Sequence, residues 1–182
     1  DCVCLCVVDP GVGTERLPVA VLADGRWYVG PDNGLFALVV RRAAEVETFA
    51  ISWRPSRLSD SFHGRDLFAP VAAMLACGRR PQMREIEPSS LERASWPDDL
   101  PRIVYIDGYG NAVTGLRART VDRQRIFTIG GHRCRFHRTF GEAAAGEVFW
   151  YRNSNDLVEI AQSGGSAARA LGLELGTPLE GQ

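Results

Sequence analysis

The feature that most constrains the fold is a change in the character of the sequence at residues 87–101. This segment contains three prolines and many charged residues, which is typical of a linker between domains. Before it, apolar runs alternate with segments of helical spacing. After it, six short strand-like runs are separated by turns, and only one stretch has helical spacing. The 182 residues therefore predict two domains, residues 1–90 and residues 101–182.

The first domain is predicted to be α/β with a mostly parallel sheet, because strands and helices alternate along the chain. Turns at 24–25 and 31–34 separate some of these elements, and Pro70 stands where the first turn of a helix tolerates a missing N–H. The expected strands are residues 2–8, 18–22, 26–29 and 47–52, and the expected helices are residues 35–45 and 67–77.

The second domain is predicted to be a small antiparallel β-barrel or sandwich, because many short strands follow one another at turn-length spacing. Its one expected helix covers residues 166–171. The expected strands are residues 102–106, 112–116, 125–129, 134–139, 147–151 and 157–161.

Composition excludes several classes of partner. A formal net charge of −1 gives no electrostatic reason to expect nucleic acid or an anionic membrane, and no apolar run approaches the ~18 residues of a membrane span. The cysteines have no zinc-binding spacing, so no metal is expected. They are predicted to be reduced and buried, which indicates the cytoplasm as location: Cys2, Cys4, Cys6, Cys77 and Cys134.

Three polar segments interrupt the apolar pattern. Residues 9–16 form a glycine-rich turn after an apolar run, but they lack the Gly-Lys-Ser/Thr of a phosphate loop and the third glycine of a dinucleotide fingerprint. Residues 61–66 place His63 just before the start of a predicted helix. Residues 107–111 are polar, as a hairpin turn favours in any case. Each segment alone is explained by local structure.

Together the segments resemble the S-adenosylmethionine hydroxide adenosyltransferases, relatives of the enzymes that fluorinate or chlorinate the same carbon. The similarity extends over essentially the whole chain. It is carried by five motifs in order: VVDPGVGTER from residue 7, VGPDNG from residue 29, SFHGRDLFAPVAA from residue 61, IDGYGN from residue 106 and LVEIA from residue 157.

The resemblance implies an enzyme that cleaves S-adenosylmethionine with water to give adenosine and methionine. In that family an aspartate, an arginine and a histidine handle the water, and they correspond to Asp9, Arg16 and His63. The halogenating relatives depart at these positions, so the retention of all three favours hydroxide over halide.

These residue types suit the reaction. Displacement at the ribose C5′ releases a neutral thioether, which needs no acid, whereas free water is a poor nucleophile with a pKa of about 15.7. Arg16 can stabilise a developing hydroxide, His63 can accept or relay its proton, and Asp9 can orient either of them. A carboxylate beside the sulfonium would stabilise the ground state more than the transition state. The acids are therefore expected to act on the water, the ribose or the amino group.

The same resemblance implies substrate contacts in the first domain from Ser61, Phe62 and Gly64, although the family usually has threonine in place of Ser61. It also implies a homotrimer with sites between subunits, and no metal or further cofactor. Relatives carry a first strand and a ribose-binding acid ahead of the segment that opens this sequence. An N-terminal segment is therefore expected to be missing, with weak activity or aggregation of the piece alone.

In the second domain the resemblance implies three contacts from one turn. Asp107 would pair with the methionine ammonium group, Tyr109 would stack on adenine, and Asn111 would hydrogen-bond the adenine edge. Ser154 and Asn155 would meet the methionine carboxylate or adenine, although the halogenating relatives carry arginine at the position of Asn155.

Two other functions remain open at the level of sequence. A protein that binds adenosine or S-adenosylmethionine without turnover would release no methionine, and the retained Asp9, Arg16 and His63 argue against it. A halogenating enzyme is disfavoured by His63 and by the absence of an inserted loop between Val8 and residues 31–34. Glu159 is either a buried structural acid or part of the site.

Overall fold

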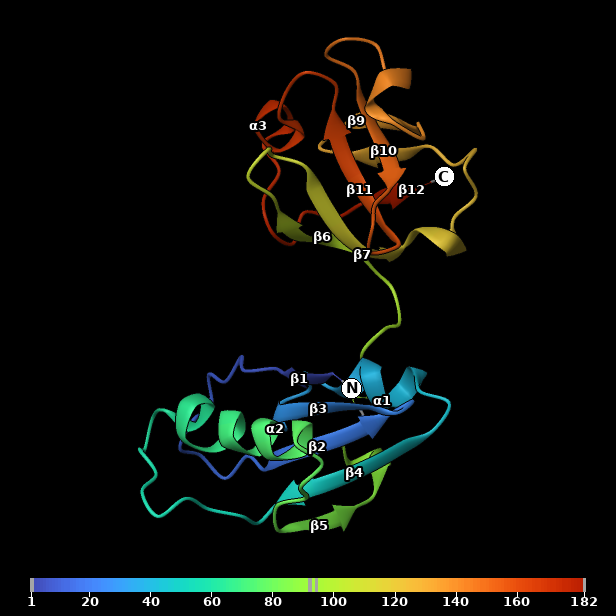
Figure 1. Ribbon diagram of the computed structural model, residues 1–182. Helices are drawn as coiled ribbons and strands as arrows, with labels where there is room; N and C mark the ends of the chain where they lie inside the picture. Colours follow the sequence, from blue (N-terminus) through green and yellow to red (C-terminus); the bar gives the residue numbers. More distant parts are fainter. Residues whose placement is uncertain (1, 92, 94, 182) are drawn as a thin grey trace. The chain divides into compact units, whose positions relative to one another are not determined.

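The structure is a computed structural model that describes residues 2–91, 93 and 95–181. The chain divides into two compact units, Asp1–Trp96 and Pro97–Gln182, which are described separately below (Figure 1). Part of the segment predicted as a linker belongs to the first unit. It forms the short helix η2 (Pro88–Ser90), and Leu91 is 2% exposed within a hydrophobic core.

The first unit is a five-stranded sheet in the order β1-β3-β2-β4-β5. Its elements in chain order are β1 (Val3–Leu5), β2 (Pro18–Ala23), β3 (Arg26–Pro31), α1 (Ala37–Arg42), β4 (Val46–Ile51), η1 (Gly64–Phe68), α2 (Ala69–Ala76) and β5 (Met83–Ile86). The predicted helices 35–45 and 67–77 correspond to α1 and α2, with Pro70 in the first turn of α2. Residues 6–8 lie outside β1, so the first strand is shorter than predicted.

The α/β class is confirmed, but the prediction of a mostly parallel sheet is wrong. Only β1 and β3 pair in parallel, whereas β2–β3, β2–β4 and β4–β5 are antiparallel among the described residues. The physical reason is the tight turn at Asp24 and Gly25, whose φ values are 47° and 77°. This turn folds β2 back beside β3, and β2 thereby separates β3 from β4, which runs in the same direction as β3.

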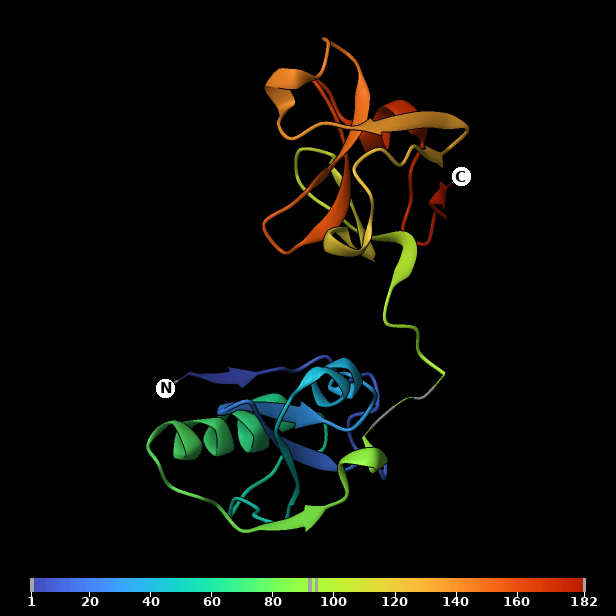
Figure 2. The same ribbon diagram turned by 90° about the vertical axis from the view of Figure 1, so that its right-hand side faces the viewer.

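The sheet of the first unit is covered on both faces, which explains the continuous apolar sequence of β2. Val19 and Val21 pack toward α1 in one core cluster, while Ala20 packs toward α2 in another. All three side chains are 0% exposed. Figure 2 shows α1 and α2 separated by the sheet. The two helices therefore cover opposite faces of the sheet.

Gly30 in β3 leaves no room for a side chain. A Cβ there would lie 2.1 Å from the carbonyl oxygen of Cys6 and 3.0 Å from Cζ of Phe36. Because the nearer neighbour is backbone, it cannot rotate away. Gly30→Ala is expected to lower the free energy of unfolding by about 3 kcal/mol, measured by urea titration followed by circular dichroism.

Gly108→Ala is the control for this substitution, because a Cβ at Gly108 would meet nothing within 4 Å. Its expected change is within about 0.5 kcal/mol. Equal losses in the two variants would contradict the steric argument.

The second unit is a seven-stranded sheet in the order β12-β8-β9-β10-β11-β7-β6. Its elements in chain order are β6 (Leu100–Ile106), β7 (Ala112–Arg117), η3 (Ala118–Thr120), β8 (Phe127–Ile129), β9 (His132–Phe136), η4 (Phe140–Glu142), β10 (Val148–Arg152), β11 (Leu157–Gln162), α3 (Ala167–Leu171) and β12 (Glu180–Gly181). The predicted strands and helix all appear, with boundaries shifted by a few residues. Of the pairings between these strands, β9–β10 alone is parallel.

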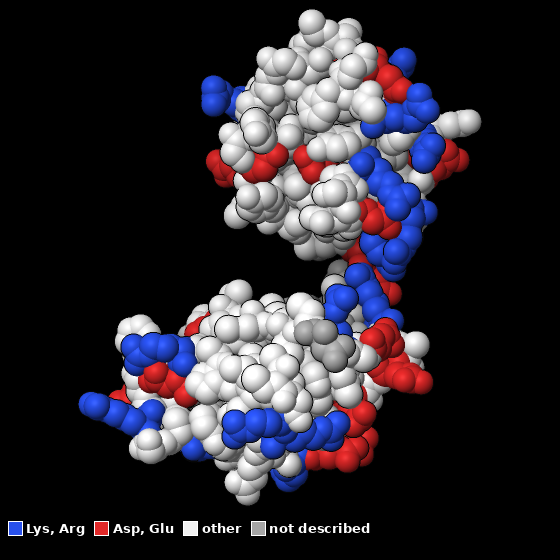
Figure 3. Space-filling view, in the orientation of Figure 1, with Lys and Arg blue, Asp and Glu red and all other residues white. Residues whose placement is uncertain are grey.

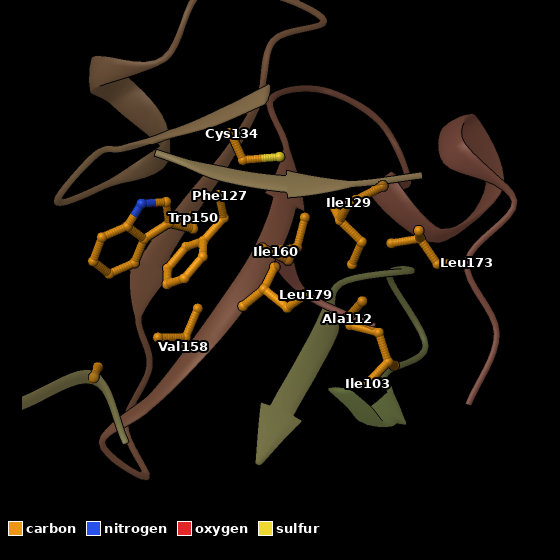
Figure 4. Packing of buried hydrophobic residues seen from close by; sticks show 12 residues of the cluster. Ile103, Ala112, Phe127, Ile129, Cys134, Trp150, Val158, Ile160, Leu173 and Leu179 are labelled. Carbon is orange, nitrogen blue, oxygen red and sulfur yellow. The ribbon is translucent and has the colours of Figure 1, made fainter. Parts of the chain in front are cut away.

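Backbone hydrogen bonds join the two edges of this sheet into a barrel-like curl. Leu179 donates to the carbonyl of Pro101 at 2.8 Å, and Ile103 donates to that of Thr177 at 2.9 Å. The chain then continues into β12, which pairs with β8. Figure 4 shows the core inside this curl, where Trp150, Phe127 and Ile160 pack together.

The cysteines are free of disulfides, but the prediction that they are buried is confirmed only for Cys134. Cys2 and Cys77 are exposed, and Cys4 and Cys6 are half-buried. Cys2 precedes β1, a strand at the edge of its sheet, and Cys77 follows the end of α2. Cys134 lies in the core of the second unit, where burial raises the pKa of its thiol to about 11. Cys134 is therefore protonated and inert at neutral pH.

None of the described helices is long and apolar enough to cross a membrane. Within the same part of the chain, no group of three or more His, Cys, Asp or Glu side chains is placed to hold a metal ion. Figure 3 shows arginine side chains interspersed with acidic ones on the visible face of each unit.

Candidate active site

The loop between β1 and β2 brings Asp9 and Arg16 together. Two successive turns reverse the chain, since Val12 donates to the Asp9 carbonyl at 3.2 Å and Thr14 donates to the Gly11 carbonyl at 3.1 Å. Gly13 adopts φ = 80°, and a Cβ there would lie 3.1 Å from the carbonyl oxygen of Asp60. Glycine therefore permits both the turn and its close approach to the loop that precedes His63.

Asp9 and Arg16 form a bidentate ion pair. Nε of Arg16 donates to Oδ1 of Asp9 at 2.8 Å, and Nη2 donates to Oδ2. Their side chains are 6% and 9% exposed, respectively. The guanidinium also lies over the buried ring of Phe68, 5.3 Å from its centroid. An arginine fork held in this way has a fixed plane and a fixed direction for its remaining N–H groups.

His63 completes the group from a second loop. Its Nδ1 lies 3.0 Å from Nη2 of Arg16. Because arginine only donates, Nδ1 must be the acceptor, and a neutral ring then carries its proton on Nε2. His63 directly precedes the π-helical turn η1, a rare geometry that is frequent at functional sites. Gly64 lets this turn approach the first loop, because a Cβ there would lie 3.0 Å from Cγ1 of Val7.

One nitrogen of Arg16 remains available. Nε and Nη2 are used by Asp9 and His63, whereas Nη1 has no hydrogen-bond partner among the described residues. Nη1 is reached by solvent, so it is not a buried donor without a partner in the described part of the chain. Two N–H donors on a fixed guanidinium can therefore bind an oxygen that approaches from outside.

The other site residues predicted in the first unit lie at the protein surface beside His63. Ser61 is exposed, Phe62 is 57% exposed, and the Arg65 guanidinium lies 5.0 Å from the centroid of the Phe62 ring. Arg65 also lowers the pKa of Asp66 through side-chain hydrogen bonds. A hollow in this region is lined by Arg57, Leu58, Ser59, Asp60, Phe62, Arg65 and Asp66. Its lining does not include Asp9, Arg16 or His63.

Three of the predicted site residues of the second unit, Asp107, Tyr109 and Asn111, lie at the turn between β6 and β7. The Asp107 carboxylate accepts from the backbone N–H groups of Tyr109 at 2.9 Å and Asn111 at 2.8 Å, and from the Asn111 side chain at 3.0 Å. Asn111 is 8% exposed, whereas Tyr109 is 84% exposed. Asp107 therefore shapes the turn and leaves a large aromatic ring projecting into solvent.

A hollow adjoins this turn and includes residues that the sequence analysis missed. It is lined by Asp107, Tyr109, Asn111, Phe140, Gln162, Gly164 and Gly165. Phe140 is 42% exposed and begins η4, far along the chain from the turn. No motif or spacing marks Phe140, so nothing in the sequence could have singled it out.

Ser154 and Asn155 lie at the opposite end of the β7–β11 pair. Asn111 directly precedes β7, while Leu157 at the start of β11 pairs with Arg117 at the end of β7. Both residues are exposed in the hairpin turn between β10 and β11, and neither lines the hollow beside Tyr109. Within this unit, the structure does not bring them together with Asp107.

Glu159 is a buried carboxylate with two partners. It is 6% exposed, and it accepts from the Tyr151 hydroxyl at 2.5 Å and from the Asn153 amide at 2.8 Å. Burial and this bond to Glu159 raise the pKa of Tyr151 well above its usual range. The Tyr151 ring lies 5.5 Å from that of Phe140, centroid to centroid. Glu159 therefore holds Tyr151, whose ring packs against Phe140 in the lining of the hollow.

Comparison with known proteins places the chain in a family. The model of the SAM hydroxide adenosyltransferase N-terminal domain matches residues 1–85, and that of the C-terminal domain matches residues 101–180. A protein of Thermus thermophilus named (R)-S-adenosyl-L-methionine hydrolase is 42% identical over 97% of this chain and 74% of its own length. A Salinispora tropica protein of the same name is 38% identical over 96% and 72%.

A solved structure from Thermus thermophilus is also similar. This conserved hypothetical protein superposes with a TM-score of 0.77 and 39% identity, over 99% of this chain and 74% of that one. Family models thus match both halves of the chain, and these relatives are more than 30% identical to it over most of its length. The chain therefore belongs to the SAM hydroxide adenosyltransferase family.

Proposed function

We propose that this protein hydrolyses S-adenosylmethionine to adenosine and methionine. The observation that carries the proposal is the group formed by Asp9, Arg16 and His63, in which a guanidinium held by two partners keeps one nitrogen available. The names of the relatives at 37–42% identity support the same reaction.

In the proposed reaction, oxygen from water forms a bond to the ribose C5′ as the C5′–S bond breaks. The electron pair of that bond goes to sulfur, which becomes the neutral thioether of methionine, and one proton is released to solvent. Nη1 of Arg16 stabilises the negative charge that develops on the attacking oxygen. Asp9 fixes the guanidinium plane, and the Nε2–H of His63 is a second donor for the same oxygen.

The role of His63 thereby becomes more specific than the sequence predicts. Its Nδ1 lone pair faces Arg16, so this nitrogen cannot accept the proton of water while that contact lasts. We assign His63 to orienting Arg16 and to donating through Nε2. Proton release then proceeds without protonation of the imidazole at Nδ1.

Substrate contacts are proposed in both units. Ser61, Phe62 and Gly64 flank the catalytic group in sequence, and the exposed aromatic ring of Tyr109 suits stacking on adenine. Asn111 and Asp107 supply polar groups beside that ring. Contacts from Ser154 and Asn155, the homotrimer with shared sites, the lack of a further cofactor and a cytoplasmic location remain predictions from the family resemblance.

The test is turnover of S-adenosylmethionine in water enriched in ¹⁸O. We expect adenosine and methionine in equal amounts, with the heavy oxygen in the 5′-hydroxyl of adenosine. The two sulfur epimers are supplied separately, because the relatives are named for the R form. Saturable binding without methionine release would support the non-catalytic alternative instead. A 5′-chloronucleoside formed only with chloride would support the halogenating one.

A further inference from the structure

The turn at residues 31–34 holds both ends of the catalytic loop. The Asn33 side-chain Nδ2 donates to the carbonyl of Val8 at 2.7 Å, and the backbone N–H of Asp32 donates to the carbonyl of Leu17 at 2.8 Å. Val8 directly precedes Asp9, and Leu17 directly follows Arg16. One turn therefore fixes the two points at which the chain enters and leaves the loop that carries the ion pair.

Asn33 has two separable bonds. Its Oδ1 accepts from the backbone N–H of Leu35 at 3.3 Å, a bond within its own turn. Its Nδ2 reaches a carbonyl 25 residues earlier in the sequence. The first bond is the ordinary capping of a turn by asparagine. The second serves the catalytic loop, and it needs a donor that aspartate lacks.

Arg93 and Trp96, near the end of the first unit, contact this turn. Nη2 of Arg93 lies 2.9 Å from Oδ1 of Asp32. The ring of Trp96 lies against Gly34, where a Cβ would come within 2.8 Å of Cη2. Arg41 holds this segment in place by donating to the carbonyls of Trp96 and Arg93, both at 2.7 Å. The turn is thus fixed by contacts that do not involve the catalytic loop.

We propose that Asn33 is a positioning residue for the site and that residues 31–34 act as a clamp on the catalytic loop. The inference rests on the proposed function. The turns inside the loop bring Asp9 and Arg16 together, and the separation at which its two ends are held fixes where the pair lies. Since a displacement of about 1 Å at a catalytic group can lower a rate 100-fold, releasing one end reduces turnover without touching the substrate.

The test compares Asn33→Asp with Asn33→Ala. Aspartate keeps the acceptor for Leu35 but removes the donor to Val8, whereas alanine removes both. We expect both variants to lower kcat about 10-fold with KM changed less than 2-fold. Deuterium exchange of the Val12 and Thr14 amides, which close the turns of the loop, is expected to accelerate by a similar factor.

Asp122→Ala is the matched control. Asp122 is an exposed turn residue of the second unit whose carboxylate accepts from the backbone N–H of Gln124 at 2.8 Å. Its removal is expected to change neither kcat nor exchange in the catalytic loop. The clamp is overturned if Asn33→Asp keeps the wild-type turnover and exchange rates and only Asn33→Ala changes them. Asn33 would then act only within its own turn. If the intact wild-type protein shows no turnover, the proposed function fails, while the exchange measurement still decides the clamp.

Discussion

Replacement of Arg16 by lysine is expected to lower kcat for S-adenosylmethionine about 1,000-fold, although the positive charge is kept. A single ammonium group cannot reproduce the fork that binds both oxygens of Asp9, contacts Nδ1 of His63 and still presents Nη1 outward. The loss corresponds to about 4 kcal/mol of transition-state stabilisation. This energy is at the upper end of the range found when one preorganised hydrogen-bond donor to a developing oxyanion is removed.

Steady-state release of methionine measures this effect, and Arg117→Lys is the matched control. Arg117 makes the same kind of fork, donating from Nε to Oδ1 of Asp99 at 2.9 Å and from Nη2 to Oδ2 at 2.6 Å. It lies in the second unit at the end of β7, so its replacement is expected to leave kcat within 2-fold. Retention of more than a tenth of wild-type turnover in Arg16→Lys would contradict the assigned role.

The folded state of the Arg16 variant needs a separate check. Asp9 is nearly buried, and removing the partner of a buried charge typically costs about 3–5 kcal/mol. Lysine retains a charge near Asp9, so a smaller loss is expected. Asp9→Asn removes the buried charge while it keeps the size of the side chain, and it is expected to lower kcat about 100-fold in a folded protein. Circular dichroism of both variants separates loss of fold from loss of catalysis.

His63→Ala is expected to lower kcat about 100-fold. Alanine removes the acceptor that orients Arg16 through Nη2, together with the Nε2–H that donates to the attacking oxygen in the proposed reaction. His132→Ala is the control, because the His132 Nδ1 lies 3.0 Å from the Gly130 carbonyl in an exposed turn of the second unit. Its turnover is expected to equal that of the wild type.

His63→Asn separates the two functions of the imidazole. The amide oxygen of asparagine can take the place of Nδ1 and accept from Arg16, but nothing replaces Nε2. We expect this variant to recover no more than about 3-fold over His63→Ala, since the donor is still missing. Full recovery would show that His63 only orients Arg16, and wild-type turnover in His63→Ala would exclude it from the site.

Much of the fold could be predicted from the sequence. Turns, strand-forming runs and helices were found because each depends on local chemistry, such as the glycine turn at 24–25 or the apolar spacing of α2. The direction of the strands in the first unit was predicted wrongly. A hairpin between β2 and β3 gives the same alternating pattern as a parallel arrangement but inserts a strand that runs the other way.

The candidate site, too, could be predicted from the sequence only in part. Asp9, Arg16 and His63 could be named from motifs, but the sequence left open which nitrogen of His63 faces Arg16, because that contact joins residues 47 apart. Phe140 enters the hollow beside Tyr109 from a loop with no motif. The bond from Asn33 to Val8 is likewise a contact between two separate loops.

By itself, the sequence determined the family, the order of the elements and the chemical types at the site. These follow from residue identity and from patterns a few residues long, which keep their meaning in any surroundings. Only the tertiary structure decided which donor faces which acceptor, which nitrogen of Arg16 stays available and which turn holds the catalytic loop. These depend on strand register and on the approach of distant loops, where a shift of one residue exchanges every partner.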